Sequence, residues 1–208
     1  MRARWSEYYS AKRIGHQALQ VRLLNELPVR RALEIGPHLG LVTAMLVHAG
    51  YDVTTLDAGP RGFDWPPTPH VEADLLGLDS ARIAGFDAIL CCEVLEHLPW
   101  HRVPDVLGTL RASSARILVV SVPYEGFQLS LSLYLNRHRV EHSLQFKKLR
   151  FLRRFVPSAQ PGGHQWEIGY RGTSLTIWER TLAAAGWRIA RREFSHPCRS
   201  VFHVLEPA

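Results

Sequence analysis

The chain has 208 residues, a length that suits one α/β domain with a full hydrophobic core. Its 46% hydrophobic and 21% charged residues exclude an intrinsically disordered chain, and no apolar run approaches the roughly 20 residues that span a bilayer. The formal net charge of +6 belongs to one segment, because residues 137–154 hold seven basic residues against the acid Glu141.

Short β-branched runs alternate with helical patterns along most of the chain, which is typical of a parallel α/β sheet. A helical segment, residues 1–29, precedes the first strand. The predicted strands are residues 31–35, 52–56, 70–73, 86–92, 116–122, 187–194 and 201–205, and the predicted helices are residues 41–49, 102–112 and 173–185. We expect a single domain over residues 1–208, an α/β Rossmann-like three-layer sandwich with a mostly parallel seven-stranded sheet and one antiparallel strand.

Residues 124–163 interrupt this alternation and contain the basic cluster. Leucines and phenylalanines from Leu144 to Phe155 have partly helical spacing, which predicts an amphipathic helix with an apolar core face and a basic solvated face. We therefore expect a basic helical insertion that covers the functional site. A second interpretation stays open, in which the cluster attracts an anionic acceptor, an acidic lipid surface or nucleic acid.

The most informative motif is Glu34–Gly40, which leaves the first strand and enters a helix. Glycines at such a turn let the backbone approach a ligand closely. Asp57 ends the next strand, and a carboxylate there can accept both hydroxyl hydrogen bonds of a ribose. The loop differs from the Gly-x-Gly-x-x-Gly of nicotinamide dinucleotide sites, and Glu34 would repel a pyrophosphate but attract a cationic ligand.

Several segments in this order resemble the class I S-adenosylmethionine-dependent methyltransferases. The matching segments are residues 34–40 (first motif), Asp57 (acid of the second strand), residues 74–75 (adenine position), residues 86–99 (fourth-strand motif), residues 117–123 (fifth strand) and residues 163–187 (late helix). The resemblance spans roughly residues 30–195. It implies an enzyme that binds S-adenosyl-L-methionine and transfers its methyl group.

The resemblance also implies a role for individual residues. Glu34 would lie near the amino group of the cofactor, the glycine loop would lie under its methionine part, Asp57 would hold the ribose, and Asp74 with Leu75 would flank the adenine. The complete set of expected cofactor contacts is Glu34, Gly36, Pro37, Gly40, Asp57, Ala58, Asp74, Leu75, Cys92 and Glu93. One position departs from the family, since His38 stands where a glycine is frequent. That side chain is tolerated if it points away from the cofactor.

A general base is needed only if the acceptor must lose a proton, and an imidazole titrates near neutrality. The candidates are His97, His101 and His164, with His97 and His164 the favoured pair. For these two, the alternative is a structural role through backbone hydrogen bonds, as at the matching positions of the family. Tyr8 and Tyr9 either close over the cofactor or only pack the N-terminal helix.

The three cysteines do not indicate a metal site. Cys91 and Cys92 are adjacent in a strand and would point to opposite faces, and Cys198 has no zinc-like spacing to either. We expect three small buried thiols and no metal.

The leading hypothesis is methyl transfer to a small-molecule O- or N-acceptor. The alternatives are a nucleic-acid or protein methyltransferase that uses the basic insertion, and a non-catalytic cofactor-binding protein on the same fold. No RNA-binding signature accompanies the basic cluster, so a nucleic-acid partner is not expected. The N-terminus lacks the apolar region of a secretory signal, which makes the cytoplasm the expected location.

Overall fold

The structure, a computed structural model, describes residues 8–147, 150–196 and 200–208. Lys148 of the basic cluster, its neighbour Leu149, and Cys198 lie outside the described residues.

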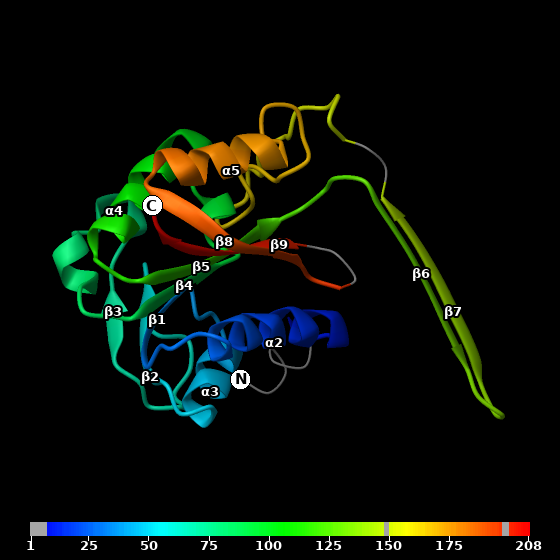
Figure 1. Cartoon of the computed structure of the whole chain (residues 1–208), viewed down its shortest axis with the longest axis horizontal. Coiled ribbons are helices and arrows are strands. Elements are labelled where there is room, and N and C mark those ends of the chain that lie inside the picture. The colour runs from blue at the N-terminus through cyan, green and yellow to red at the C-terminus, as the bar shows by residue number, and fades with distance from the viewer. Residues whose placement is uncertain (1–7, 148–149, 197–199) are drawn as a thin grey trace.

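A seven-stranded sheet runs through the centre of the molecule in the order β3-β2-β1-β4-β5-β9-β8 (Figure 1). Its strands are β1 (Arg31–Ile35), β2 (Asp52–Asp57), β3 (His70–Glu72), β4 (Ala88–Cys92), β5 (Ile117–Pro123), β8 (Trp187–Phe194) and β9 (Ser200–Pro207). The first five strands pair in parallel, and β9 is antiparallel to both of its neighbours. The predicted Rossmann-like sheet with one antiparallel strand is therefore confirmed.

Helices cover both faces of this sheet (Figure 1). One face carries α2 (Ala11–Asn25) and α3 (Leu41–His48), and the other carries α4 (Val103–Ala112) and α5 (Leu175–Ala184). Alternate residues of each strand enter separate cores, since Ala32 packs with the first pair of helices and Leu33 with the second. Short 3₁₀ helices η1 (Leu75–Gly77), η2 (Ser80–Ile83), η3 (Leu95–His97) and η4 (Trp100–Arg102) complete the connections.

The helix ends follow local chemistry. Ser174 caps α5, because its hydroxyl accepts a hydrogen bond from the backbone N–H of Ile177 at 3.2 Å, and Gly186 follows the helix at φ 82°. Pro104 lies in the first turn of α4, where a missing N–H costs little. Both features match the predicted boundaries to within one or two residues.

The expectation of a basic helix over the site is wrong. Strands β6 (Gln128–Leu135) and β7 (Val140–Lys147) form a separate antiparallel hairpin that projects away from the sheet (Figure 1). The reason is the strict alternation of Leu129, Leu131, Leu133 and Leu135 with polar residues or tyrosine, which places the four leucines on one face of a strand. Turns and irregular backbone, and no helix, occupy the described residues 150–163.

None of the helices within the described ranges combines the length and the apolar character needed to cross a membrane.

Candidate functional site

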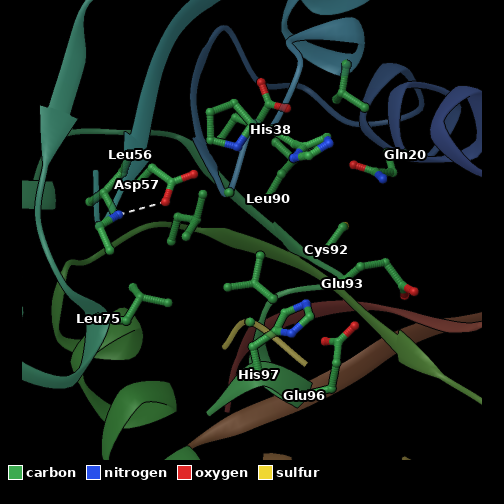
Figure 2. A pocket seen from close by; sticks show the side chains of 18 of the residues that line it. Gln20, His38, Leu56, Asp57, Leu75, Leu90, Cys92, Glu93, Glu96 and His97 are labelled. Carbon is green, nitrogen blue, oxygen red and sulfur yellow. Dashed lines mark hydrogen bonds between the residues drawn. The ribbon is translucent and has the colours of Figure 1, made fainter. Parts of the chain in front are cut away.

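A cavity of about 710 Å³ opens at the carboxyl ends of β1, β2 and β4, beneath α2 (Figure 2). This volume lies in the range of small-molecule and cofactor sites, and the location is where open parallel sheets bind ligands. Nine of the ten expected cofactor contacts line it, as do His97 and His164: Glu34, Gly36, Pro37, Asp57, Ala58, Asp74, Leu75, Cys92 and Glu93. Among the described residues, Gly40, Tyr9 and His101 are not part of this lining.

Glu34 places a carboxylate inside this cavity, although only 4% of the residue is exposed. The hydroxyl of Thr43, in α3, donates a hydrogen bond to its Oε2 at 2.5 Å. Burial raises the pKa of Glu34 to about 7, and the Thr43 hydrogen bond only partly opposes that effect. A cationic ligand group placed beside this side chain would favour its ionised form.

Two positions of the loop after β1 have no room for a side chain. Gly36 has φ 72°, and a Cβ there would meet a methyl group of Val94 at 2.6 Å. Gly40 has φ 77° and faces the ring of Phe63 at about the same distance, so its role is packing at the start of α3. Because Gly36 and Val94 both line the cavity, this part of the loop forms its wall.

His38 does not point away from the cavity. It adopts the left-handed backbone (φ 50°) that a glycine would take there, and its imidazole lies 4.3 Å from the ring of Tyr8. Both residues line the cavity. Tyr8 faces the cavity, as expected of a residue that closes over the cofactor. Tyr9 is buried, as expected of a residue that packs the N-terminal helix.

The ends of β2 and β3 supply polar groups at the side of the cavity opposite α2 (Figure 2). Oδ1 of Asp57 accepts the backbone N–H of Ala58 at 2.7 Å, which fixes the carboxylate at the end of its strand. Oδ1 of Asp74 accepts the N–H of Leu76 at 2.9 Å, so Asp74 also caps η1 and holds Leu75 against the cavity.

The end of β4 turns sharply into the cavity. Glu93 has φ 57°, and its Oε1 accepts a hydrogen bond from the hydroxyl of Ser121 at 2.9 Å. The Sγ of Cys92 donates to the carbonyl of Val119 at 3.7 Å. Burial raises the pKa of the Cys92 thiol, so the group stays neutral and offers no thiolate nucleophile.

His97 and His164 lie together, with ring centroids 5.1 Å apart. The loop that carries His164 is tied to η3, because the backbone N–H of Gln165 donates to the carbonyl of Glu96 at 2.7 Å. Nδ1 of His164 lies 2.8 Å from Oε1 of Glu167. Burial, and then the nearby His164, lower the pKa of His97. Both imidazoles are thus brought to the cavity that the sequence predicted them to share.

Four cavity residues from α2 were missed by the sequence analysis: Arg13, His16, Gln17 and Gln20. Their spacing of three, four and seven residues places them on one face of the helix, and that polar stripe was the available signal. His16 and Gln20 are less than 9% exposed, and Nε2 of His16 lies 3.9 Å from Oε1 of Glu93. The N-terminal helix is therefore a wall of the site and more than a packing element.

Comparison with known proteins finds relatives that are named as O-methyltransferases. The ubiquinone biosynthesis O-methyltransferase of Xanthomonas campestris pv. campestris is 27% identical over 164 residues, which cover 74% of this chain and 62% of that protein. The ubiquinone biosynthesis O-methyltransferase of Methylocella silvestris is 34% identical over 96 residues, 42% of this chain and 35% of that protein. The chain thus spans less than two thirds of the length of these relatives. No protein-family model matches the chain.

Solved structures share the whole fold. An N-methyltransferase from Bradyrhizobium japonicum in complex with S-adenosyl-L-homocysteine aligns with a TM-score of 0.63 and 15% identity, over 98% of this chain and 91% of that one. The 1,6-didemethyltoxoflavin-N1-methyltransferase of Burkholderia thailandensis, with its substrate and S-adenosylhomocysteine bound, gives 0.61 and 18%, over 100% and 82%. The fold is that of the class I S-adenosylmethionine-dependent methyltransferases, which confirms the resemblance seen in the sequence.

Proposed function

We propose that this chain is a single-domain methyltransferase that binds S-adenosyl-L-methionine in the cavity and methylates a small-molecule O- or N-acceptor. One observation carries the proposal: the buried carboxylate of Glu34 and the carboxylate of Asp57 line a single cavity at the ends of adjacent parallel strands. An ammonium or sulfonium suits the first group, and a ribose diol suits the second.

The residues present fit this cofactor. Glu34 would bind the ammonium of its methionine part, and Arg13, which also lines the cavity, would pair with its carboxylate. Asp57 would accept the ribose hydroxyls, and Leu75 would contact the adenine. The backbone of Gly36, which lines the cavity, would lie under the methionine part.

When bound, S-adenosyl-L-methionine supplies a methyl carbon that an acceptor lone pair attacks while the carbon–sulfur bond breaks and its electron pair returns to sulfur. The work left to the protein is to align the acceptor and to exclude water. His97 and His164 lie at the cavity, where either could contact an acceptor. The thiol of Cys92 stays neutral, so it would not compete with an acceptor as a nucleophile in this cavity.

A small-molecule acceptor is supported by the relatives. Their names give ubiquinone biosynthesis as the role of the O-methyltransferases, and 1,6-didemethyltoxoflavin is bound in the Burkholderia thailandensis structure. Arg137 and Arg139 lie in the turn of the hairpin that projects away from the sheet whose strand ends form the cavity (Figure 1), so these two residues do not support a nucleic-acid acceptor there.

Titration calorimetry with S-adenosylhomocysteine tests the proposal. We expect one binding site, and an affinity loss of at least about tenfold in Asp57→Ala, since a hydrogen bond to a charged group contributes about 1.5–3 kcal/mol. Asp52→Ala is the matched control, because Asp52 begins the same strand, is exposed and lies outside the lining. Absence of binding to folded protein, or equal affinities for wild type and Asp57→Ala, would overturn the proposal.

A further inference from the structure

Three side chains at the edge of the cavity have the chemistry of a metal site. One carboxylate oxygen of Glu96, one ring nitrogen of His97 and one ring nitrogen of His164 all lie within 4.8 Å of one another. We propose that Glu96, His97 and His164 bind a divalent transition-metal ion, with Zn²⁺ as the reference ion, next to the methyl acceptor. The sequence alone does not indicate this metal site, since only the fold brings His164 beside the other two.

The fold holds this trio through backbone hydrogen bonds. Glu96 and His97 are consecutive in η3, and their side chains extend to the same side of the cavity (Figure 2). The bond from the N–H of Gln165 to the carbonyl of Glu96, at 2.7 Å, ties the His164 loop to η3. A second tie is the indole N–H of Trp166, which donates to the carbonyl of Leu98 at 3.1 Å. To bind one ion, the three side chains would rotate so that their ligand atoms reach bonding distance.

The surroundings favour metal binding by His164. Its Nδ1 lies 2.8 Å from Oε1 of Glu167, a partner that accepts the N–H and leaves the lone pair of Nε2 for a ligand bond. A carboxylate behind a histidine is the usual support of metal-bound imidazole, because it fixes the tautomer and the ring orientation. Glu167 is itself only partly exposed, with 18% of its side chain accessible.

The charge of the trio fits a divalent cation. Glu96 is 0% exposed, so a cation bound beside it in this region of low dielectric would strongly stabilise its ionised carboxylate. Two imidazoles and one carboxylate are a ligand set of catalytic zinc and of other first-row metals, and three protein ligands leave positions open for water or substrate. His97 is exposed to the cavity, which gives an ion or an acceptor a way in.

The consequence for the acceptor rests on the proposed function. A cation beside the transferred methyl group selects an acceptor that offers it an oxygen ligand, because a bound hydroxyl has a lowered pKa. The hydroxyl proton would pass to water, and the oxygen lone pair would form the bond to the methyl carbon as the carbon–sulfur bond breaks toward sulfur. We therefore infer a hydroxylated acceptor, such as a phenol, in preference to an amine.

The test uses full-length protein that has been freed of any histidine tag and treated with a chelator. Titration with Co²⁺, followed by visible absorption, and with Zn²⁺, followed by calorimetry, is expected to show one ion per chain with a Kd in the micromolar range or below. His97→Ala and His164→Ala should each weaken binding at least about tenfold, and Glu96→Gln should do the same. His101→Ala is the matched control, since His101 lies in the neighbouring η4 but outside the cavity lining.

Circular dichroism of each variant separates loss of a ligand from loss of the fold, and the exposed His97 makes His97→Ala the variant least prone to unfold. Failure of Zn²⁺ to bind the folded wild-type protein, or equal Zn²⁺ affinity in wild type and both histidine variants, would overturn the metal site.

Parallel titration with S-adenosylhomocysteine distinguishes the two proposals. Cofactor binding without Zn²⁺ binding removes the metal site alone, whereas Zn²⁺ binding without cofactor binding removes the proposed function and leaves the metal site standing. Addition of catechol to the Co²⁺-loaded protein with S-adenosylhomocysteine should shift the absorption bands, and aniline should not. An equal response to both compounds would contradict the preference for a hydroxylated acceptor.

Discussion

Thr43, in α3, donates a hydrogen bond from its hydroxyl to the carboxylate of Glu34, in β1, at 2.5 Å. This contact holds a nearly buried carboxylate at the wall of the cavity, and burial still raises its pKa to about 7. The other titratable groups that influence it, Tyr9 and Cys92, both have raised pKa values and stay neutral at pH 7. In the free protein, Glu34 is therefore protonated in a large share of molecules at neutral pH.

The affinity for S-adenosylhomocysteine should depend on pH because its ammonium requires an ionised Glu34. Below pH 7 the free protein must first lose the proton, so the affinity should rise by up to about tenfold per pH unit from pH 5.5 to 7 and then level off. Calorimetry at pH 5.5, 6.5 and 7.5 measures this. Glu34→Gln keeps the bond to Thr43 without the charge, and should bind more weakly at pH 7.5 with little pH dependence. A wild-type affinity that does not change over this range would exclude the ammonium from this position.

The same carboxylate should cost stability above neutral pH. Its pKa in the folded protein is raised above the unfolded value of 4.5, so its favourable contribution is present below pH 4.5 and is lost as pH rises through about 7. Glu34→Gln should therefore be more stable than wild type at pH 8, by at most about 3 kcal/mol, and this advantage should shrink toward pH 5. Chemical unfolding at both pH values measures it. A Glu34→Gln variant less stable than wild type at pH 8 would contradict the effect of burial.

Gly36→Ala should lower both stability and cofactor affinity. The residue has φ 72°, and the new Cβ would meet Val94 at 2.6 Å. Strain and overlap together should cost about 1–3 kcal/mol, visible as a lower Tm and weaker binding of S-adenosylhomocysteine. Gly108→Ala in α4 is the opposite control: nothing lies within 4 Å of its Cβ position, so alanine should stabilise by up to about 1 kcal/mol. A normal Tm in Gly36→Ala would show that the loop can rearrange.

Asp87→Ala should destabilise the sheet at the end opposite the cavity. One carboxylate oxygen of Asp87 accepts the N–H groups of Arg30 and Arg31 at 2.9 Å, and the other accepts from the guanidinium of Arg116 at 3.0 Å. The two backbone bonds, and then Arg116, lower the pKa of Asp87 to about 2. We expect a loss of about 1–3 kcal/mol at pH 7.

That loss has a defined pH dependence. Because the folded pKa of Asp87 lies below its ordinary value of 3.8, the stabilisation is present above pH 3.8 and is lost as pH falls through about 2. The difference in unfolding free energy between wild type and Asp87→Ala should thus narrow in acid. Asp105→Ala removes an exposed ion pair with Arg102 and should cost less than about 1 kcal/mol. An equal loss of unfolding free energy in Asp87→Ala and Asp105→Ala would show that the hydrogen bonds of Asp87 stabilise the sheet no more than an exposed ion pair does.

The sheet was predictable because buried parallel strands leave a strong signal. Residues 117–123 are an unbroken apolar run but for Ser121, and the structure buries all seven. Arg31–Ile35 and Trp187–Phe194 have the bounds expected from the sequence. Gly36 follows the first of these strands, and Gly186 lies between the end of α5 and the second. These glycines mark the limits of the strands.

The cavity was predictable only in part, because its walls come from distant segments. The carboxyl ends of β1, β2 and β4 follow from strand order, so Glu34 and Asp57 could be assigned in advance. That α2 faces the same cavity is a tertiary fact, and the polar stripe of Arg13 and Gln20 would read equally well as a solvated helix face. The proximity of His164 to Glu96 depends on hydrogen bonds between distant segments, from Gln165 to Glu96 and from Trp166 to Leu98, which no local pattern encodes.

In the segment of the hairpin, the apolar residues fit both the two-residue period of a strand and the longer period of a helix. The leucines of β6 alternate strictly, whereas Leu144 and Phe146 also fit a helical period together with the leucines and phenylalanines of residues 149–155. In the structure, Leu131 pairs with Leu144 and Leu129 with Phe146, so these side chains share one face of the ribbon. A two-stranded ribbon is marginal alone, and its apolar face is exposed here, with Leu131 at 74%.

Removing the hairpin should leave the fold and the cavity intact. Residues 129–146 can be replaced by Asn-Gly, because the flanking Gln128 and Lys147 are paired and a two-residue turn joins such a pair. The strands of the hairpin pair with each other and project away from the sheet (Figure 1), so we expect a Tm within a few degrees of wild type and unchanged affinity for S-adenosylhomocysteine. Solubility should increase, since an exposed apolar face promotes association. Leu131→Ser with Leu144→Ser, which keeps the chain length, should raise solubility in the same direction. A large fall in Tm on deletion would mean that the hairpin packs on the body of the protein in solution, and its apolar face would then belong to the core.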